Sequence, residues 1–386
     1  MRHLVCGYRL PKFTQHCNMI NFDKSEIKKQ ITTEQVFELL LDWNGEPEYT
    51  SFGIVSRTIC HNVAGEGSRK LYFYSDSQLF YCYTGGCAEP SFDIFELAIK
   101  VAKIQEGKTL DLNDAVRALA YRFGYLDFIE DQQEEKLEDW KVFNRYDRIN
   151  SIKIKDYDIV LKEYDKSILN KFNYNVRLEP WLNDNIKQEI LEKAQIGFYP
   201  GGDQITIPHF DKDGRLVGIR GRALCQEEAE RFGKYRPLKI NGEYYTHPLG
   251  MNLYNFNNSK DNIKKMGKAI VFESEKSTLQ MQGYLGVDND MSVAVCGSNI
   301  TAYQMHMLIT AGAKEVCVAF DHQFKKLGDE EYIKQVKLFK KIQERYKNYV
   351  QLSFICDKAG ITGYKASPSD EGLEKFLKLF KERIVL

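Results

Sequence analysis

Short apolar runs alternate with longer amphipathic stretches in the last third of the chain. Four runs read as strands, at residues 268–272, 293–295, 315–320 and 350–356, and the first contains four consecutive apolar residues, which is typical of a buried strand. Three stretches have helical spacing, beginning at residue 276 and covering 301–311 and 330–347. This order predicts a mostly parallel sheet with helices between its strands.

Acidic residues follow the predicted strands. Glu273 comes directly after the first, Asp321 directly after the third and Asp357 directly after the fourth. The carboxyl ends of parallel strands meet at one edge of an open sheet, where such sheets bind their ligands. Two carboxylates at one edge repel each other unless a cation joins them, and carboxylate oxygens suit Mg²⁺ or Mn²⁺. The pattern therefore predicts a divalent-cation site.

Helical patterns also mark the first third of the chain. Thr32 and Gln35 have the spacing of a capping box before a periodic apolar set, which predicts a helix of about three turns. Residues 92–103 are amphipathic, and a further helical pattern at 112–123 ends at Gly124.

Cysteines flank a predicted β-hairpin between these helices. Cys60 and His61 precede the hairpin, and Cys82 and Cys87 follow its second strand. Three thiolates and one imidazole complete a tetrahedral zinc shell without an open position, so the metal would be structural. The alternative is a set of buried free cysteines with a surface histidine.

A local group of basic residues lies in the middle of the chain. Residues 204–224 read as a hairpin with a turn at Asp213-Gly214. Its second strand and the segment after it carry the candidate nucleic-acid or nucleotide contacts Arg215, Arg220, Arg222, Lys234 and Tyr235. Glycines on both sides of Arg220 would let a backbone approach closely. The alternative is a solvated strand face.

The composition limits the function. The chain has 386 residues, 43% of them apolar, and 54 basic residues balance 54 acidic ones. A neutral chain has no global basic field, so any nucleic-acid surface must be local. The absence of a membrane-length apolar run and of a signal-peptide core predicts a protein of the cytoplasm without a membrane partner.

These patterns predict a multidomain α/β and α+β protein. An N-terminal zinc ribbon of β-hairpins and helices precedes a mixed α+β subdomain and an α/β subdomain with a mostly parallel sheet. The expected parts are a leader at 1–18, a zinc-binding domain at 19–125, a charged linker at 126–150, a subdomain with the basic hairpin at 151–262, and the parallel-sheet subdomain with a C-terminal helix at 263–386.

In combination, the motifs resemble DnaG-type DNA primases, especially the shorter versions carried by bacteriophages and mobile elements. The cysteine pattern followed by FDIFEL resembles the primase zinc-binding domain, and GRLVGIRGRAL resembles the start of the RNA-polymerase domain. FESEKS and VAFDHQ resemble the two signature segments of the Toprim fold. The resemblance covers roughly residues 19–386, and the order of the motifs is more specific than any one of them.

The resemblance implies a nucleotidyltransferase that makes short RNA primers on single-stranded DNA for DNA replication. It implies that Glu273 and Asp321 are catalytic and hold Mg²⁺ or Mn²⁺ with Asp357 or Asp370, and that Lys276 assists as a nearby cation. Arg220, Arg222 and Lys234 would hold phosphates of template or nucleotide. The implied partners are ribonucleoside triphosphates, nascent RNA and a replicative helicase, in a bacterial cell.

Two departures from the family pattern bear on activity. Gln323 stands where the family has the second acid of Asp-x-Asp, and Ala366 stands where it has a later acid. Two further hypotheses therefore remain, a Toprim-type nuclease and a catalytically weakened homologue that binds DNA or a helicase.

Overall fold

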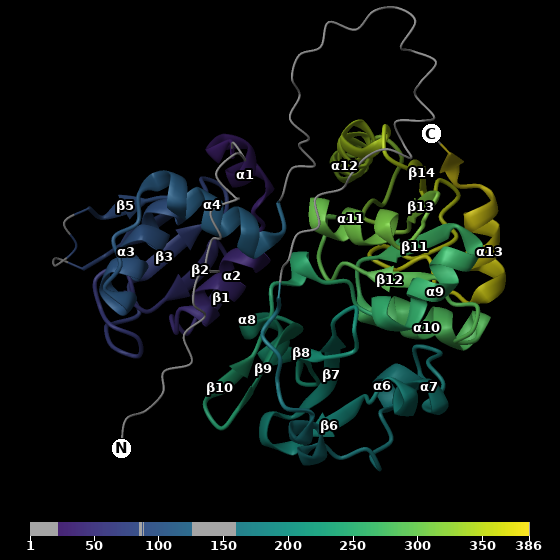
Figure 1. Ribbon diagram of the computed structural model, residues 1–386, viewed down its shortest axis with the longest axis horizontal. Coiled ribbons are helices and arrows are strands. Elements are labelled where there is room, and N and C mark those ends of the chain that lie inside the picture. Colours follow the sequence, from purple (N-terminus) through teal and green to yellow (C-terminus); the bar gives the residue numbers. More distant parts are fainter. Residues whose placement is uncertain (1–21, 85–86, 88, 126–159, 386) are drawn as a thin grey trace, which may run out of the picture. The chain divides into compact units, whose positions relative to one another are not determined.

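The structure is a computed structural model that describes residues 22–84, 87, 89–125 and 160–385 (Figure 1). The predicted leader at 1–18 and linker at 126–150 lie outside these residues. Contacts divide the chain into two units. The first unit comprises Met1–Asp127, Gly201–Gln204 and Arg220–Thr246, and the second comprises Phe128–Pro200, Ile205–Ile219 and His247–Leu386. The domain boundaries inferred from the sequence remain predictions.

The N-terminal module is an antiparallel sheet with helices. The strands, in the spatial order β1-β2-β3-β4-β5, are β1 (Glu48–Thr50), β2 (Gly53–Ser56), β3 (Leu71–Tyr74), β4 (Leu79–Cys82) and β5 (Ser91–Phe92). The helices are α1 (Lys24–Gln30), α2 (Thr33–Asp42), α3 (Ile94–Glu106) and α4 (Leu112–Phe123).

Local sequence signals set the ends of these helices. The predicted capping box of Thr32 and Gln35 is confirmed, because each side chain bonds the other residue's backbone amide at the start of α2. Asp93 and Glu96 form a second capping box at α3. Gly107 and Gly124 end α3 and α4 in the left-handed conformation, which glycine adopts without a steric cost.

The core of the module lies between its sheet and its helices. Phe73 and Phe80 form a cross-strand pair with ring centroids 4.9 Å apart, and both are buried. Phe95 and Leu97 of α3 belong to the same apolar cluster. Because alternate strand residues point to opposite faces, the tyrosines next to these phenylalanines face away from the core.

The middle of the chain contains a second five-stranded sheet. Its strands, in the spatial order β10-β9-β8-β7-β6, are β6 (Gly197–Tyr199), β7 (Gln204–Phe210), β8 (Leu216–Ala223), β9 (Tyr235–Ile240) and β10 (Glu243–Tyr245). The short helices of this region are η3 (Lys166–Lys171), α6 (Glu179–Leu182), α7 (Gln188–Lys193), η4 (Pro200–Gly202), α8 (Gln226–Phe232) and η5 (Leu249–Met251). The predicted turn at Asp213-Gly214 separates β7 from β8, and Gly214 has a φ of 78°.

The predicted parallel sheet forms the centre of the second unit. Its strands, in the spatial order β12-β11-β13-β14-β15, are β11 (Lys268–Phe272), β12 (Ser292–Ala294), β13 (Glu315–Val318), β14 (Gln351–Phe354) and β15 (Ile384–Val385). Strand β11 pairs in parallel with β12 and β13, and β13 pairs in parallel with β14. The helices are α9 (Phe256–Met266), α10 (Glu275–Leu285), α11 (Ala302–Thr310), α12 (Glu330–Tyr346) and α13 (Leu373–Lys381).

Both faces of this sheet are covered by helices (Figure 1). Ala269 and Val271 of β11 belong to an apolar cluster with residues of α9, α11 and α12. Ile270 and Phe272, which alternate with them, pack with residues of α10 and α13 on the other face. A strand that is buried on both sides must be apolar throughout, which explains the uninterrupted run at this position.

The end of the chain differs from the prediction. The expected final helix ends at Lys381, and the chain then adds β15 antiparallel to β14. The two-residue β-branched strand was too short to give a periodic signal. The predicted fold class, a multidomain α/β and α+β protein with an N-terminal zinc ribbon and a mostly parallel sheet, is confirmed. None of the described helices is both long and apolar enough to cross a bilayer.

Glu315 joins several strands of the parallel sheet, and its removal is expected to lower stability. Its carboxylate accepts hydrogen bonds from Ser353 and Arg383 at 2.7 and 2.8 Å and pairs with Lys268 at 3.1 Å. Burial alone would raise the pKa of Glu315, but these partners lower it to about 2. The stabilisation is therefore complete above the unfolded pKa of about 4.3 and is lost as the pH falls towards 2.

We expect Glu315→Gln to lose about 2–3 kcal/mol of unfolding free energy at neutral pH, with the difference from wild type shrinking below about pH 4. Urea unfolding across this pH range measures the effect. Glu371→Gln removes an exposed pair with Lys375 and serves as the control. A deficit that is constant with pH would contradict the assignment.

Candidate active site and zinc site

Glu273 and Asp321 come together at the carboxyl edge of the parallel sheet. Glu273 follows the last residue of β11, and Asp321 lies three residues beyond the end of β13, its parallel neighbour. The backbone amide of Asp321 donates a hydrogen bond to Oε1 of Glu273 at 3.1 Å. Since the strands run in parallel and in register, their ends place the two acids side by side.

The environment of Glu273 opposes its ionisation. Burial, followed by the nearby charge of Asp321, raises the pKa of Glu273 to about 8, although hydrogen bonds from the Asp321 amide and the Gln323 side chain act in the other direction. A divalent cation between the two carboxylates would remove the repulsion. Gln323 stands where the family has the second acid of Asp-x-Asp. Its side-chain amide makes a hydrogen bond with Glu273.

Asp357 lies after β14, the next strand of the sheet, and its carboxylate is engaged by its own loop. The amide and hydroxyl of Thr362 donate to Oδ2 at 2.6 and 2.9 Å, and Nδ1 of His322 lies 3.7 Å away. Burial raises the pKa of Asp357, but the hydrogen bonds from Thr362 and Ile361 outweigh it, so the pKa lies below its usual value. Among the described residues, Glu273, Asp321 and Asp357 do not form a group with all ligand atoms within 4.8 Å of one another.

Asp370 and Lys276 pair with each other. The Nζ atom of Lys276 lies 2.6 Å from Oδ1 of Asp370 and 3.8 Å from Oδ2 of Asp184. The amide of Ser367 donates to the other oxygen of Asp370 at 2.9 Å. The predicted roles of Lys276 as a catalytic cation and of Asp370 as a metal ligand remain predictions.

Ala366 lies beside the loop that carries Asp321. The backbone amide of His322 donates to the carbonyl of Ala366 at 2.9 Å, and the amide of Lys365 donates to the carbonyl of His322 at 2.7 Å. The backbone at Ala366 is therefore tied to the residue after Asp321. An acidic side chain at position 366 would therefore lie near the sheet edge where Glu273 and Asp321 meet.

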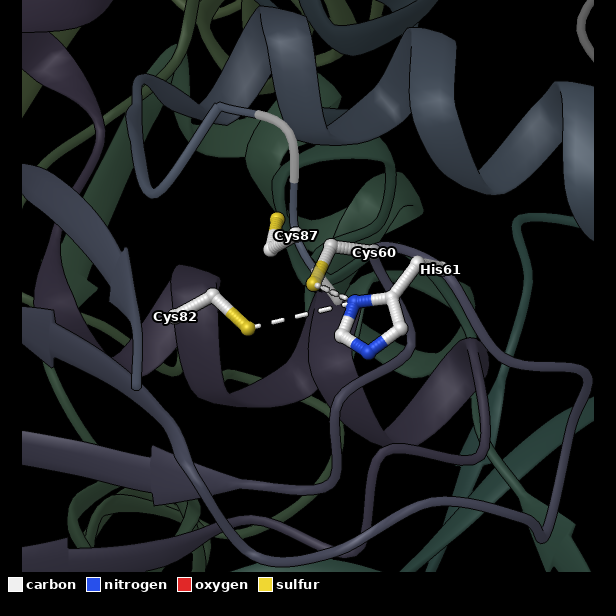
Figure 2. Close-up of side chains that lie close together, drawn as sticks. All are labelled: Cys60, His61, Cys82 and Cys87. Atoms are coloured by element: carbon white, nitrogen blue, oxygen red, sulfur yellow. Dashed lines mark hydrogen bonds between the residues drawn. The ribbon is translucent and has the colours of Figure 1, made fainter. Parts of the chain in front are cut away.

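The four predicted zinc ligands converge in the N-terminal module. The ligand atoms of Cys60, His61, Cys82 and Cys87 all lie within 4.8 Å of one another, and Figure 2 shows the three sulfurs on the Nδ1 side of the imidazole ring. Nδ1 of His61 lies 3.1 Å from Sγ of Cys60 and 3.9 Å from Sγ of Cys82. The adjacent Cys60 and His61 can therefore face the same point, although neighbouring side chains often diverge.

The surroundings of these side chains fit a zinc ion. Nε2 of His61 lies 3.3 Å from the hydroxyl of Thr84, which leaves Nδ1 for the metal and fixes the ring. Burial and the neighbouring thiols of Cys82 and Cys87 raise the pKa of the Cys60 thiol, a cost that a bound cation would remove. The cluster thus fits a structural zinc site with three thiolates, one imidazole and no open position.

No family model matches the chain. The chain is 32% identical over 381 residues to the SPbeta prophage-derived uncharacterized protein YorJ of Bacillus subtilis (strain 168), and the match covers 95% of this chain and 98% of that protein. The chain belongs to the YorJ family.

Solved structures of bacterial primases are among those similar to this YorJ-family chain. The zinc-binding and RNA polymerase domains of the Aquifex aeolicus primase share 19% identity and a TM-score of 0.44, covering 95% of this chain and 87% of that one. The E. coli primase catalytic core shares 18% identity and a TM-score of 0.43, covering 57% of this chain and 79% of that one.

Four of the predicted basic-hairpin residues lie together in the YorJ-family chain. Arg220 and Arg222 alternate along β8 and therefore share a face, and Arg222 pairs in register with Tyr235 of β9. The Arg220 guanidinium and the Lys234 ammonium lie 5.6 and 6.0 Å from the centre of the Tyr235 ring. Arg215 instead pairs with Asp211 and Asp213 at the hairpin turn, at 2.7 and 3.2 Å.

The glycines around Arg220 have a different role from the one predicted. A Cβ atom at Gly218 would collide with the ring of His247, and one at Gly221 would collide with the side chain of Gln204. The missing side chains make room for neighbours within the fold, so they are not evidence for a closely approaching phosphate.

Sequence reasoning missed an exposed aromatic face on the N-terminal sheet. Tyr72 and Tyr74 of β3 alternate with core residues, and Tyr81 and Tyr83 do the same at β4. Tyr83 is 53% exposed, and its ring lies 4.8 Å from Tyr81 and 5.2 Å from Tyr72. Phe52 lies 5.4 Å from Tyr74 and is also exposed. The alternation of tyrosines is the signal that could have found this face.

Proposed function

We propose that this YorJ-family protein is a DNA primase, a nucleotidyltransferase that makes short RNA primers on single-stranded DNA. The contact between Glu273 and Asp321 is the observation that supports it most. Two acids at neighbouring strand ends, one with its pKa raised to about 8, form a site that favours a divalent cation. Nucleotidyl transfer needs such a cation next to the triphosphate.

Glu273 and Asp321 are the proposed ligands of Mg²⁺ or Mn²⁺. When bound, the ion supplies positive charge for the triphosphate and the leaving pyrophosphate. Glu273 and Asp321 orient it, and the amide contact between them holds the Glu273 carboxylate in place. Gln323 contributes a neutral hydrogen bond to Glu273 where the family has an acid. Asp357, bound by Thr362, would have to leave its loop to join them.

Arg220, Arg222, Lys234 and Tyr235 are the proposed contacts to template or nucleotide phosphates. Nε of Arg222 is buried and has no hydrogen-bond partner within the described part of the chain. A phosphate oxygen would satisfy such a donor. The chain is neutral as a whole, so a compact basic group gives phosphate affinity without a general attraction to nucleic acid.

The aromatic face of Phe52, Tyr72, Tyr74, Tyr81 and Tyr83 is the proposed platform for the template. Phe52, Tyr81 and Tyr83 are exposed, Tyr72 and Tyr74 are half-buried, and rings with such spacing can stack on successive unpaired bases. Duplex DNA, with its bases already stacked, cannot use such a surface. The aromatic face therefore favours single-stranded DNA as the partner of the N-terminal module.

Replacing both Tyr81 and Tyr83 with alanine is expected to weaken single-stranded DNA binding by about 30-fold or more, because two rings are removed and base stacking is worth ~1–3 kcal/mol per base. Fluorescence anisotropy with a labelled oligonucleotide measures the change. Phenylalanine at both positions keeps the rings and is expected to keep most of the affinity. Equal losses in the alanine and phenylalanine variants would argue against stacking.

A primer-synthesis assay tests the function. The full chain is incubated with single-stranded DNA, labelled ribonucleotides and Mg²⁺ or Mn²⁺, and we expect short RNA products that require both template and metal. If no template and neither metal gives products, the primase proposal is wrong. An arm without nucleotides detects metal-dependent cutting, which is the expectation for the Toprim-type nuclease.

A catalytically weakened homologue is the second candidate, and the surroundings of the acids favour it. Asp357 and Asp370 are held by other partners, and Ala366 replaces an acid next to the Asp321 loop. We expect Ala366→Asp to raise primer synthesis if the site is only impaired. An unchanged rate would mean that this position was never part of the site.

The remaining partners belong to the same proposal. A primase would use ribonucleoside triphosphates, hold the nascent RNA and work beside a replicative helicase. The prophage origin of the YorJ relative supports a phage or mobile element in a bacterial cell as the setting.

A further inference from the structure

A second group of metal-ligand side chains lies inside the unit that contains the parallel sheet. His209 is on β7, Glu275 is the first residue of α10, and Cys296 follows β12. Their ligand atoms all lie within 4.8 Å of one another. None of the three belongs to the zinc module or to the acids at the sheet edge.

The group is built from buried side chains. His209 and Glu275 are each 1% exposed, and Nε2 of His209 lies 3.1 Å from Oε1 of Glu275. The rings of His247 and Tyr254 lie 4.8 and 5.0 Å from the His209 ring and close the site on that side. Burying a carboxylate is costly unless a partner compensates its charge.

Cys296 provides a third possible metal ligand beside His209 and Glu275. A hydrogen-bonded pair of histidine and glutamate does not require a cysteine next to it. Its backbone has a φ of 57°, in the left-handed region that residues other than glycine rarely adopt. Sulfur, imidazole nitrogen and carboxylate oxygen are the three ligand types that Zn²⁺ binds in proteins. A thiol brought to a buried imidazole and carboxylate therefore gives a ligand set of the right chemistry.

We propose that His209, Glu275 and Cys296 bind a second zinc ion. With zinc–nitrogen and zinc–oxygen bonds of ~2.0–2.1 Å, tetrahedral ligands lie about 3.3 Å apart, close to the observed separation of His209 and Glu275. The fourth position is left to water or to the hydroxyl of Tyr254, whose ring centroid lies 5.0 Å from that of His209.

The ion would join three segments around the end of β11. Glu275 lies two residues after Glu273, so the ion would fix the turn between β11 and α10 to β7 and to the segment after β12. Ser274, the N-cap residue of α10, makes no side-chain capping bond there. The site would thus hold the backbone that positions Glu273. The proposal does not depend on primase activity.

Metal content of the full chain tests the proposal. Protein expressed with added zinc and dialysed against metal-free buffer is expected to contain about two zinc ions per chain, one in each site. Cys296→Ser and His209→Gln are each expected to reduce this to about one, while Cys225→Ser, at an exposed cysteine, retains both. About one ion in the wild type, unchanged by Cys296→Ser, would overturn the proposal.

Alkylation gives a readout on the unaltered chain. The thiols are treated with iodoacetamide before and after zinc is removed by a chelator, and labelled peptides are identified by mass spectrometry. We expect Cys296 to be protected until chelation and Cys225 to be labelled in both samples, because a zinc-bound thiolate reacts slowly. Labelling of Cys296 that does not change on chelation would refute the second site even if the variants fail to fold.

Discussion

Glu273→Gln is expected to reduce primer synthesis by about a hundredfold to a thousandfold, the loss typical of removing one group that stabilises developing charge. Glutamine has the shape of glutamate but no charge, so the change tests the metal-binding role without opening a cavity. The rate of primer synthesis at saturating template and nucleotide measures it. Asp288→Asn neutralises an exposed acid of the same unit and is expected to leave the rate unchanged.

Stability separates loss of function from loss of fold in this variant. The pKa of Glu273 is raised to about 8 in the folded protein by burial and by Asp321, above its unfolded value of about 4.3. Ionisation of Glu273 therefore costs stability as the pH rises through this interval. We expect metal-free Glu273→Gln to melt at or above the wild-type temperature near pH 8. A variant that loses activity and also unfolds would not support a catalytic role.

The strand ends were predictable because they depend on local signals. The run at 269–272 is apolar at every position because both faces of β11 are covered, and the acid after it marks the carboxyl end of the strand. Once the strands are taken as parallel, the meeting of Glu273 and Asp321 follows from topology. The capping boxes at Thr32 and Asp93 are equally local, since each joins residues three positions apart.

The hydrogen bonds and ion pairs of Asp357 and Asp370 were not predictable from the spacing of residues along the chain. Asp357 is bound by Thr362, and Asp370 pairs with Lys276, because the loops after β14 fold back on the sheet edge. The sequence contains nothing periodic in those loops. The presence of a carboxylate in a sequence does not by itself show whether the side chain binds a metal or forms hydrogen bonds within its own loop.

Long-range side-chain contacts were also beyond sequence reasoning. His209 and Glu275 are 66 positions apart and meet only because β7 lies next to the start of α10 in the folded unit. A lone histidine in the apolar strand ITIPHF reads as a core residue. The zinc ligands, in contrast, form two pairs that are close in the sequence, one before and one after the β3–β4 hairpin, so the sequence alone indicated them.

Removal of zinc from the site formed by Cys60, His61, Cys82 and Cys87 is expected to unfold much of the N-terminal module. Structural zinc contributes apparent binding free energies of about 10–16 kcal/mol in small zinc domains, and that energy is lost with the metal. The module also has an apolar core of its own sheet and helices, which should retain part of the helical signal. Cys82→Ser, at a buried ligand on β4, is therefore expected to lower zinc content, melting temperature and template binding together.

His61 gives the sharpest form of this prediction. Its Nδ1 faces Cys60 and Cys82 while Nε2 contacts Thr84, so alanine removes a ligand and cysteine replaces it with another. We expect His61→Ala to lose zinc under mild chelation and His61→Cys to retain it, since four thiolates also form a structural zinc shell. Zinc content after dialysis against a weak chelator, beside thermal unfolding, measures both. If alanine and cysteine retain zinc equally, the imidazole is not a ligand, and the three thiolates bind the ion with a group outside the predicted set.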